Sequence, residues 1–256
     1  MDERQRQAWR ALALGPVWQR RHDLPVSGSM NTDVLGVIGV IAAVVAIADE
    51  ARPGEVTPTL TVPTWTSLRQ AVDACANCTR AASRIEPVFG SGASQATWMV
   101  VGDQPDDGDE AAGEPYSGTA GQLLDQMLGA VGASRRRDVF VTQSLKCRAP
   151  DDHPPRSDEL DACSGHLRHQ IGLIIPALIL ALGHAPARSL LGVQTPYRDL
   201  RGQVHVWRDG ELRIPVVVTH DPADLLRHPQ DKAQTWADLR LARRCFDEAA
   251  RSQTPD

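Results

Sequence analysis

The sequence predicts an α/β protein, a three-layer α/β/α sandwich with a central, mainly parallel sheet. Apolar runs typical of strands recur at 97–101, 139–142, 177–182 and 214–219. Neighbouring runs are far enough apart for a crossover helix, which is the pattern of a parallel sheet covered on both faces. Composition agrees, since 256 residues with 42% hydrophobic and 23% charged side chains suit a globular protein with a sizeable core.

Helices are expected between and after these strands. Ser157, followed by two acidic residues, supplies a capping hydroxyl for a helix whose apolar spacing turns Cys163 inward. A second apolar stripe predicts a helix within 118–132, and a third predicts a helix from 231 to about 250. These helices complete the alternation of strand and helix.

The chain divides into an arm, a domain and a tail. Residues 1–63 lack the βα rhythm and are expected to form an appendage, 64–250 the α/β domain, and 251–256 a tail. The apolar run 34–48 is shorter than the roughly 17 to 25 residues of a membrane span, so we interpret it as a buried helix. We expect a cytoplasmic monomer without a membrane contact.

Charge bounds the choice of partner. The net charge of −5 gives no general attraction for nucleic acid, so a DNA partner would need a local basic patch such as 135–137. Lys146 and Arg227 are candidate phosphate contacts. The acidic residues within 106–110 are interpreted as a solvated loop, because they lack the regular ligand spacing of an EF-hand.

Four of the five cysteines form the most informative pattern in the chain. Cys75 and Cys78 make a C-x-x-C pair, and Cys147 and Cys163 could complete a four-ligand site. The odd total and the absence of a signal peptide predict reduced thiols. Their spacing leaves three interpretations open, namely an iron–sulfur cluster, a zinc site and buried thiols; Cys245 is expected to pack in a helix.

Candidate ligand-binding residues follow the predicted strands. Ligands of an open parallel sheet bind beyond the carboxyl ends of its strands. The segment 102–105 leaves the first strand, Gln143 leaves the second, and His220 and Asp221 leave the last. Glycines in 113–121 precede a helix whose free amides could face a ligand. A nucleotide-binding enzyme is disfavoured, because the chain lacks both the G-x-x-x-x-G-K-[ST] and the G-x-G-x-x-G pattern in this segment.

Three segments of the chain, 102–124, 140–150 and 219–227, carry motifs that resemble those of the family 4 uracil-DNA glycosylases. Residues 102–124 resemble a G-E-x-P-G start followed by G-x-P-F-x-G-x-A-G-x-L-L. Residues 140–150 resemble the T-N-x-x-K-C-R-P-P strand and loop, and 219–227 resemble H-P-S/A-x-L-L-R. The similarity covers roughly residues 65 to 245.

The resemblance implies a DNA-repair hydrolase with the uracil-DNA glycosylase fold, which breaks the N-glycosidic bond of uracil or another deaminated base in DNA. It implies a 4Fe-4S cluster on the four cysteines, which match the family's positions. It also implies roles for the motif residues: water positioning at the first motif, a ring stacked on the flipped base, an amide that reads the base edge, and a group that donates to the base oxygen. These positions are Asp103 with Gln104, Tyr116, Gln143 and Asp221. The resemblance also implies that Gln104, Pro105, Tyr116 and Gln143 bind the substrate.

Several of these positions depart from the family pattern. Asp103 replaces a glutamate, Gln143 an asparagine and Asp221 a histidine. An ionised Asp221 would oppose the negative charge of a departing uracil. Two substitutes are possible, a protonated Asp221 and the neighbouring His220. The alternative function is a weakened homologue that binds DNA or a partner without base excision.

Overall fold

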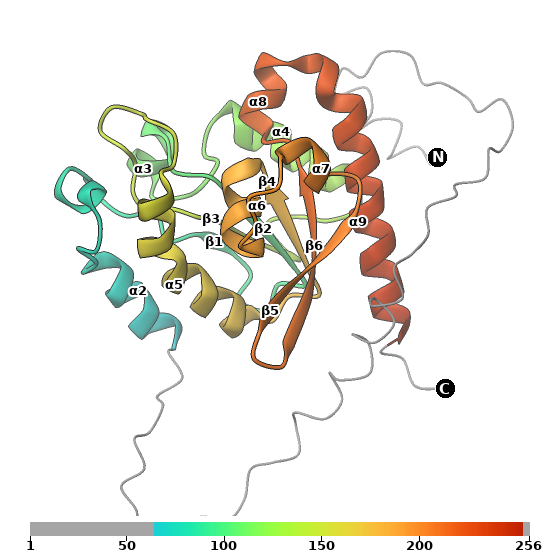
Figure 1. Ribbon diagram of the computed structural model, residues 1–256, viewed down its shortest axis with the longest axis horizontal. Helices are drawn as coiled ribbons and strands as arrows, with labels where there is room; N and C mark the ends of the chain where they lie inside the picture. Colours follow the sequence, from blue (N-terminus) through green and yellow to red (C-terminus); the bar gives the residue numbers. More distant parts are fainter. Residues whose placement is uncertain (1–63, 253–256) are drawn as a thin grey trace, which may run out of the picture.

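The computed structural model describes residues 64–252, which form one six-stranded sheet with helices on both faces (Figure 1). The expected arm at 1–63, its apolar run and most of the tail lie outside the described residues. The strands are β1 (Ser91–Gly92), β2 (Trp98–Gly102), β3 (Val139–Gln143), β4 (Leu178–Leu182), β5 (Val204–Asp209) and β6 (Leu212–Thr219). Their order is β1-β3-β2-β4-β6-β5.

The four central strands are parallel and the two edge strands are antiparallel. β3, β2, β4 and β6 pair in parallel, whereas β1 runs antiparallel to β3 and β5 runs antiparallel to β6. All four predicted strands are therefore present, and the predicted mainly parallel sheet is confirmed. Both edge strands, β1 and β5, were missed.

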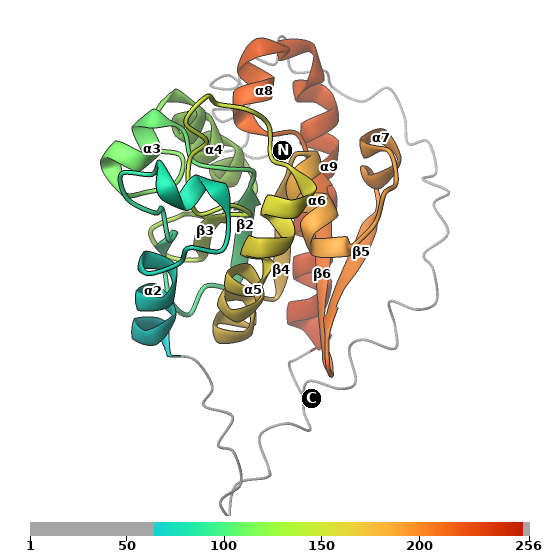
Figure 2. The ribbon, with the colours of Figure 1, turned by 60° about the vertical axis from the view of Figure 1, so that its left-hand side comes forward.

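The helices follow the chain between and beyond these strands. They are α2 (Trp65–Asp73), the 3-10 helix η3 (Thr79–Ala82), α3 (Asp107–Ala112), α4 (Thr119–Ala130), α5 (Ser157–Ile174), α6 (His184–Leu191), α7 (Tyr197–Leu200), α8 (Pro222–Arg227), the 3-10 helix η4 (Pro229–Asp231) and α9 (Lys232–Ser252). Figure 2 shows α5 and α9 on opposite sides of the sheet. Within 64–252 no helix is long and apolar enough to cross a membrane.

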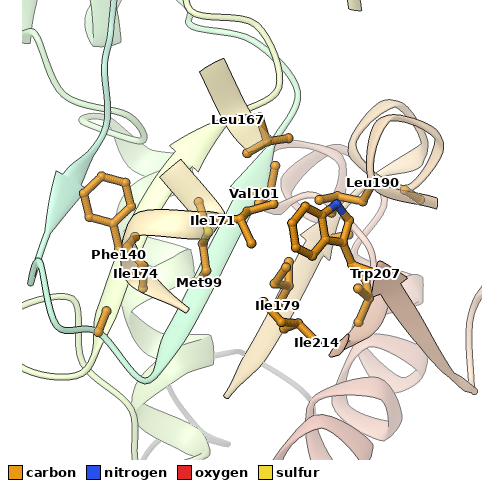
Figure 3. Packing of buried hydrophobic residues seen from close by; sticks show 14 of the residues in the cluster. Met99, Val101, Phe140, Leu167, Ile171, Ile174, Ile179, Leu190, Trp207 and Ile214 are labelled. Atoms are coloured by element: carbon orange, nitrogen blue, oxygen red, sulfur yellow. The ribbon is translucent and has the colours of Figure 1, made fainter. Parts of the chain in front are cut away.

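Alternation along each strand builds two separate cores. In β2, Trp98 and Val100 pack with α4, α8 and α9, whereas Met99 and Val101 pack with α2, α5 and α6. Figure 3 shows the second core, in which Ile171 of α5 lies over the buried strand residues. Because successive side chains point to opposite faces, a wholly apolar strand requires helices on both sides. The three-layer sandwich follows from this pattern.

The amino terminus of α5 differs from the prediction in one detail. Ser157 is the first helical residue and does not cap the helix. Instead the Oε2 atom of Glu159 accepts a 3.0 Å hydrogen bond from the amide of Arg156. Cys163 lies on the buried side of α5, as its spacing predicted.

Candidate active site

The residues of the candidate site lie at the carboxyl ends of the parallel strands. Gly102 of β2 is in register with Gln143 of β3, and Leu182 of β4 is in register with Thr219 of β6. Asp103 and Asp221 therefore leave the same edge of the sheet. The amide of Gly183 donates to the carbonyl oxygen of Thr219 at 2.8 Å, which joins the last two strand ends.

Asp103 and Asp221 approach each other beside Gly183. A Cβ atom placed on Gly183 would lie 3.3 Å from Asp103 Oδ1 and 3.8 Å from the Cβ atom of Asp221, so a side chain here would crowd both. Gly183 also has a φ of +100°, which favours glycine. Asp103 Oδ1 is buried and has no hydrogen-bond partner among the described residues. A small residue at the end of β4 thus opens space for two carboxyl groups.

The environment makes both carboxyl groups harder to ionise. Burial, followed by the charges of Asp221 and Asp224, raises the pKa of Asp103 to about 7. Burial raises the pKa of Asp221 to about 6, although hydrogen bonds from Tyr116 and from the Ala223 amide act in the opposite direction. Both carboxyl groups therefore change protonation state close to neutral pH.

Tyr116 joins the pair through its hydroxyl group. Its Oη atom donates a 2.5 Å hydrogen bond to Asp221 Oδ2, and its ring lies where a side chain on Gly102 would collide with it. The backbone of Tyr116 has a φ of 55° and passes so close to Gly121 that a side chain there would also collide. The resemblance implied a stacking ring here; the structure adds a hydrogen bond from the phenol hydroxyl to a carboxyl group.

Asp221 is held at both oxygens. Its Oδ1 atom accepts a 2.7 Å hydrogen bond from the amide of Ala223 at the start of α8, while Oδ2 accepts from Tyr116. His220, the other candidate for the family histidine position, has different neighbours. Its Nδ1 atom lies 3.0 Å from Thr235 Oγ1 of α9, and its ring meets the edge of Tyr197. The structure thus joins Asp221, and not His220, to Tyr116.

Gln143 is buried and anchored by its amide nitrogen. Nε2 donates 2.9 Å hydrogen bonds to the carbonyl oxygen of Gln104 and to Asp109 Oδ2. Its Oε1 atom is buried and has no partner among the described residues. Asp109 was missed, because the sequence interpretation treated 106–110 as a solvated loop. That interpretation is wrong for Asp109 and Glu110, which are buried in α3.

A capping signal could have revealed α3. Asp106 Oδ1 accepts a 2.8 Å hydrogen bond from the Asp109 amide, as an aspartate at a helix amino terminus commonly does. Gly113, in the left-handed conformation, ends the helix. An aspartate and a glycine that flank six residues were therefore readable as the two ends of a short helix.

Gln104 and Pro105 belong to the wall behind the site. Pro105 is buried, and the side chain of Gln104 is occupied by two partners. Gln104 Oε1 accepts a 3.0 Å hydrogen bond from Arg80, and Nε2 donates to the carbonyl oxygen of His153 at 3.1 Å. Arg80 also forms a fully buried 2.8 Å ion pair with Glu159 of α5. Gln104 thus ties the first-motif loop to the cysteine-bearing segments.

The structure corrects the expected phosphate contact at Lys146. Lys146 is 1% exposed, and its Nζ atom donates to Thr142, Gln143 and Gln170 inside the domain. Burial lowers its pKa to about 8. Arg135 of the expected basic patch bonds to Asp125 and to the carbonyl oxygen of Tyr116. Arg227 remains exposed, paired with Asp224 on α8.

Three of the four motif cysteines lie around one guanidinium group, that of Arg84. Arg84 donates a 3.3 Å hydrogen bond to Cys147 Sγ, and the charges of Cys147, Cys75 and Cys78 raise its pKa, although burial acts in the opposite direction. The charges of Cys147 and Cys75 contribute to the raised pKa of Cys163. All four are free thiols. Within the described residues, no three His, Cys, Asp or Glu side chains are already arranged to hold a metal ion.

The donor set nevertheless suits an iron–sulfur cluster. Such clusters are held by four cysteine thiolates, and these thiols come from four points that fold together: the end of α2, the start of η3, the β3–α5 loop and α5. Burial raises the pKa of Cys147 and Cys163, whereas Arg84 lowers that of Cys147 and Lys146 lowers that of Cys163. Two cations are therefore placed to stabilise thiolates.

Comparison with known proteins finds a matching family model and several similar proteins. Residues 89–240 match the family model described as the uracil DNA glycosylase superfamily. The chain is 33% identical over 178 residues to the type-4 uracil-DNA glycosylase of Pyrobaculum aerophilum, covering 68% of this chain and 90% of that protein. It is 35% identical over 159 residues to the type-4 enzyme of Thermotoga maritima, covering 61% of this chain and 80% of that protein.

Proposed function

The chain belongs to the uracil DNA glycosylase superfamily, and from that membership we propose that it hydrolyses the N-glycosidic bond of uracil or another deaminated base in DNA. The observation that carries this proposal is the convergence, at the carboxyl ends of the parallel strands, of two partly buried carboxyl groups and a buried amide. Among them, Asp103 Oδ1 and Gln143 Oε1 are acceptors without a partner among the described residues. Such groups suit a polar ligand that enters the site.

The electrostatics of the reaction suit the carboxyl pair. Bond breakage places positive charge on the deoxyribose and negative charge on the departing base. The positive sugar favours the ionised form of Asp103, which can hold and deprotonate the attacking water. The negative base favours the protonated form of Asp221, which can donate to a base oxygen. One proton shared by the pair therefore meets both needs in the transition state.

Tyr116 orients Asp221 in this arrangement. Its hydroxyl holds Oδ2, and the Ala223 amide holds Oδ1, so the carboxyl group has a fixed direction at the start of α8. Its ring also lies against the Gly102 backbone, next to Asp103. The phenol and the carboxyl group together stand where the family pattern has a phenylalanine and a histidine.

We further propose that Cys75, Cys78, Cys147 and Cys163 hold a 4Fe-4S cluster. When bound, the cluster serves as a structural cross-link between segments and takes no part in bond cleavage. Arg84 and Lys146 would stabilise the thiolates, and Arg80 would connect their segments to the Gln104 loop. The proposed enzyme acts in the cytoplasm as a monomer on DNA whose damaged base has turned out of the helix.

The test is base release from single-stranded oligonucleotides that carry one uracil, hypoxanthine or xanthine. The protein as purified, with its iron and sulfide measured, should release at least one base and leave an alkali-labile abasic site. Asp103→Asn should abolish release while retaining the circular dichroism spectrum. Binding of all three oligonucleotides with no release from any would contradict the proposal and support a non-excising homologue.

A further inference from the structure

The amide group of Gln143 has no hydrogen left to offer a ligand. A glutamine amide carries two N–H donors and one carbonyl acceptor. Both donors of Gln143 are used, one by the carbonyl oxygen of Gln104 and one by Asp109 Oδ2, each at 2.9 Å. The remaining group, Oε1, is buried without a partner among the described residues. Only an acceptor is therefore free.

The neighbours determine which end of the amide is which. A carbonyl oxygen and a carboxyl oxygen are both acceptors, so the end of Gln143 that faces them must be the NH₂ group. Turning the amide over would set Oε1 against two other oxygens. The acceptor-only arrangement is thus required by Gln104 and Asp109 together.

Asp109 is itself held firmly. Its Oδ1 atom accepts hydrogen bonds from the amide of Ser117 at 2.8 Å and from the Ser117 hydroxyl at 3.1 Å. Its side chain lies in α3 and is 3% exposed, while Gln143 is 2% exposed. Each carboxyl oxygen of Asp109 thus has a defined donor, and the orientation of Gln143 is transmitted from the α3–α4 loop to the end of β3.

We propose that Gln143 reads a bound base solely as a hydrogen-bond acceptor, and that Asp109 is the positioning residue that makes it so. The inference rests on the proposed function, because it places a base against Gln143. A base that binds here must then present an N–H group to Oε1 of Gln143, as uracil does at N3 and hypoxanthine does at N1. Cytosine presents a lone pair at N3, which would face the oxygen of Gln143.

Loss of Asp109 would remove this selectivity. With one of its two acceptors gone, the amide of Gln143 can turn over and present Nε2 to N3 of cytosine. A correctly paired base edge is worth roughly ten- to a hundredfold in discrimination against the wrong base. Removing the anchor should reduce the preference for uracil over cytosine by about tenfold or more, since a single remaining hydrogen bond opposes the rotation.

The experiment compares kcat/KM for uracil- and cytosine-containing single-stranded oligonucleotides in three variants. Asp109→Ala should lower the uracil-to-cytosine ratio by about tenfold or more. Asp109→Asn should lower it as well, because the single asparagine oxygen accepts from the Ser117 amide and the NH₂ group then faces Gln143, which favours the turned amide. Glu110→Ala is the matched control: Glu110 is the next residue of α3, buried, and accepts a 2.9 Å hydrogen bond from the Ile85 amide. It should leave the ratio unchanged.

Partial unfolding would lower both rates together and leave their ratio alone. An unchanged ratio in Asp109→Ala, in an enzyme that does release uracil, would overturn the inference while the proposed function stands. If no base is released, equilibrium binding of free uracil and free cytosine provides the same ratio. A preference for uracil that Asp109→Ala removes supports the inference without the function; no preference, or no binding, overturns it.

Discussion

Asp103 and Asp221 both lie beside Gly183, after the ends of β2 and β6, and their surroundings contain more acidic than basic groups. Tyr116 approaches from the α3–α4 loop, and Asp224 and Arg227 lie on α8. Asp224 and Arg227 pair with each other, so Arg227 only partly offsets the rise in the pKa of Asp221. The pKa values of about 7 and about 6 therefore describe a pair that loses its two protons in close succession.

This pair predicts a narrow bell-shaped dependence of kcat/KM on pH. Below the lower pKa both carboxyl groups are protonated, so Asp103 cannot accept a proton from water. Above the higher pKa both are ionised, so Asp221 cannot donate to the base. The rate should thus be greatest between about pH 6 and 7, where the pair holds one proton, as measured by steady-state base release. The higher pKa of Asp103 keeps that proton mainly on Asp103, so the reacting form is the minor one, in which Asp221 holds it.

Asp221→Asn provides the control for this profile. Its amide donates at every pH, so the alkaline limb should disappear. Removal of a like charge should also lower the pKa of Asp103, because the charge of Asp221 helps to raise it. A wild-type rate that stays constant from roughly pH 4 to 9, about two units to either side of the pair, would contradict the shared-proton mechanism.

Tyr116→Phe should destabilise the folded protein by about 1 to 2 kcal/mol, because Asp221 loses a hydrogen bond in a buried place. The same change should raise the pKa of Asp221, since the phenol hydroxyl lowers it. Chemical denaturation measures the first effect, and carbon-detected NMR titration of the carboxyl group measures the second.

Tyr197→Phe is the matched control. The hydroxyl of Tyr197 is buried and has no hydrogen-bond partner among the described residues. Its removal should therefore change the free energy of unfolding by less than about 0.5 kcal/mol. Equal losses in the two variants would show that the Tyr116–Asp221 hydrogen bond contributes no specific stability.

Among the secondary-structure elements, the sequence predicted the four buried strands because their apolar character reflects burial on both faces. It missed β5, which pairs with β6 across a turn at Gly210 with a φ of 53°. An Asp-Gly pair between two strand-like runs is a strong hairpin signal, so Asp209 and Gly210 could have revealed this edge. β1 has two residues and carries no comparable signal.

The candidate site, too, was predictable from the sequence only in part. Strand ends are readable from sequence, so Asp103, Gln143 and Asp221 were expected at one edge, and the structure places them there. Side-chain partners depend on neighbours from distant segments and are not readable in this way. Lys146 follows a strand end as a surface lysine would, yet Gln170 from α5 supplies a buried acceptor for it.

The ion pair between Arg80 and Glu159 predicts a large effect on stability. Both side chains are almost completely buried, at 1% and 2% exposure, and they join η3 to α5. Glu159→Ala leaves a buried guanidinium without its carboxylate partner, so the free energy of unfolding should fall by about 3 kcal/mol or more. Urea denaturation of the protein as purified measures the change.

The control for this ion pair is Asp138→Ala. Asp138 pairs with Arg137 at 3.4 Å on the surface, where the two side chains are 36% and 70% exposed. Water screens such a pair, so the change should cost less than about 1 kcal/mol. If Glu159→Ala cost no more than this control, Arg80 would not depend on Glu159 for its burial.

In the molecule as a whole, the cysteine segments and the site are parts of one structure. Arg80 of η3 contacts Gln104 after β2, the Cys147 carbonyl oxygen and Glu159 of α5. Gln104 in turn accepts from Gln143 through its backbone oxygen. A cross-link among the cysteines would therefore stabilise the loop that orients Gln143, although it lies outside the set of reacting groups.

This arrangement predicts that iron content and stability depend on the four motif cysteines and not on the fifth. Replacing any of Cys75, Cys78, Cys147 or Cys163 by serine should abolish the visible sulfide-to-iron absorption and lower the melting temperature, because a three-thiolate site holds the cluster poorly. Cys245→Ser is the control, since Cys245 lies in α9 and packs against the core on the α4, α8 and α9 face of the sheet. It should retain both iron and absorption. Anaerobically purified protein that contains no iron, or a Cys245→Ser variant that loses it, would contradict the proposed assignment of ligands.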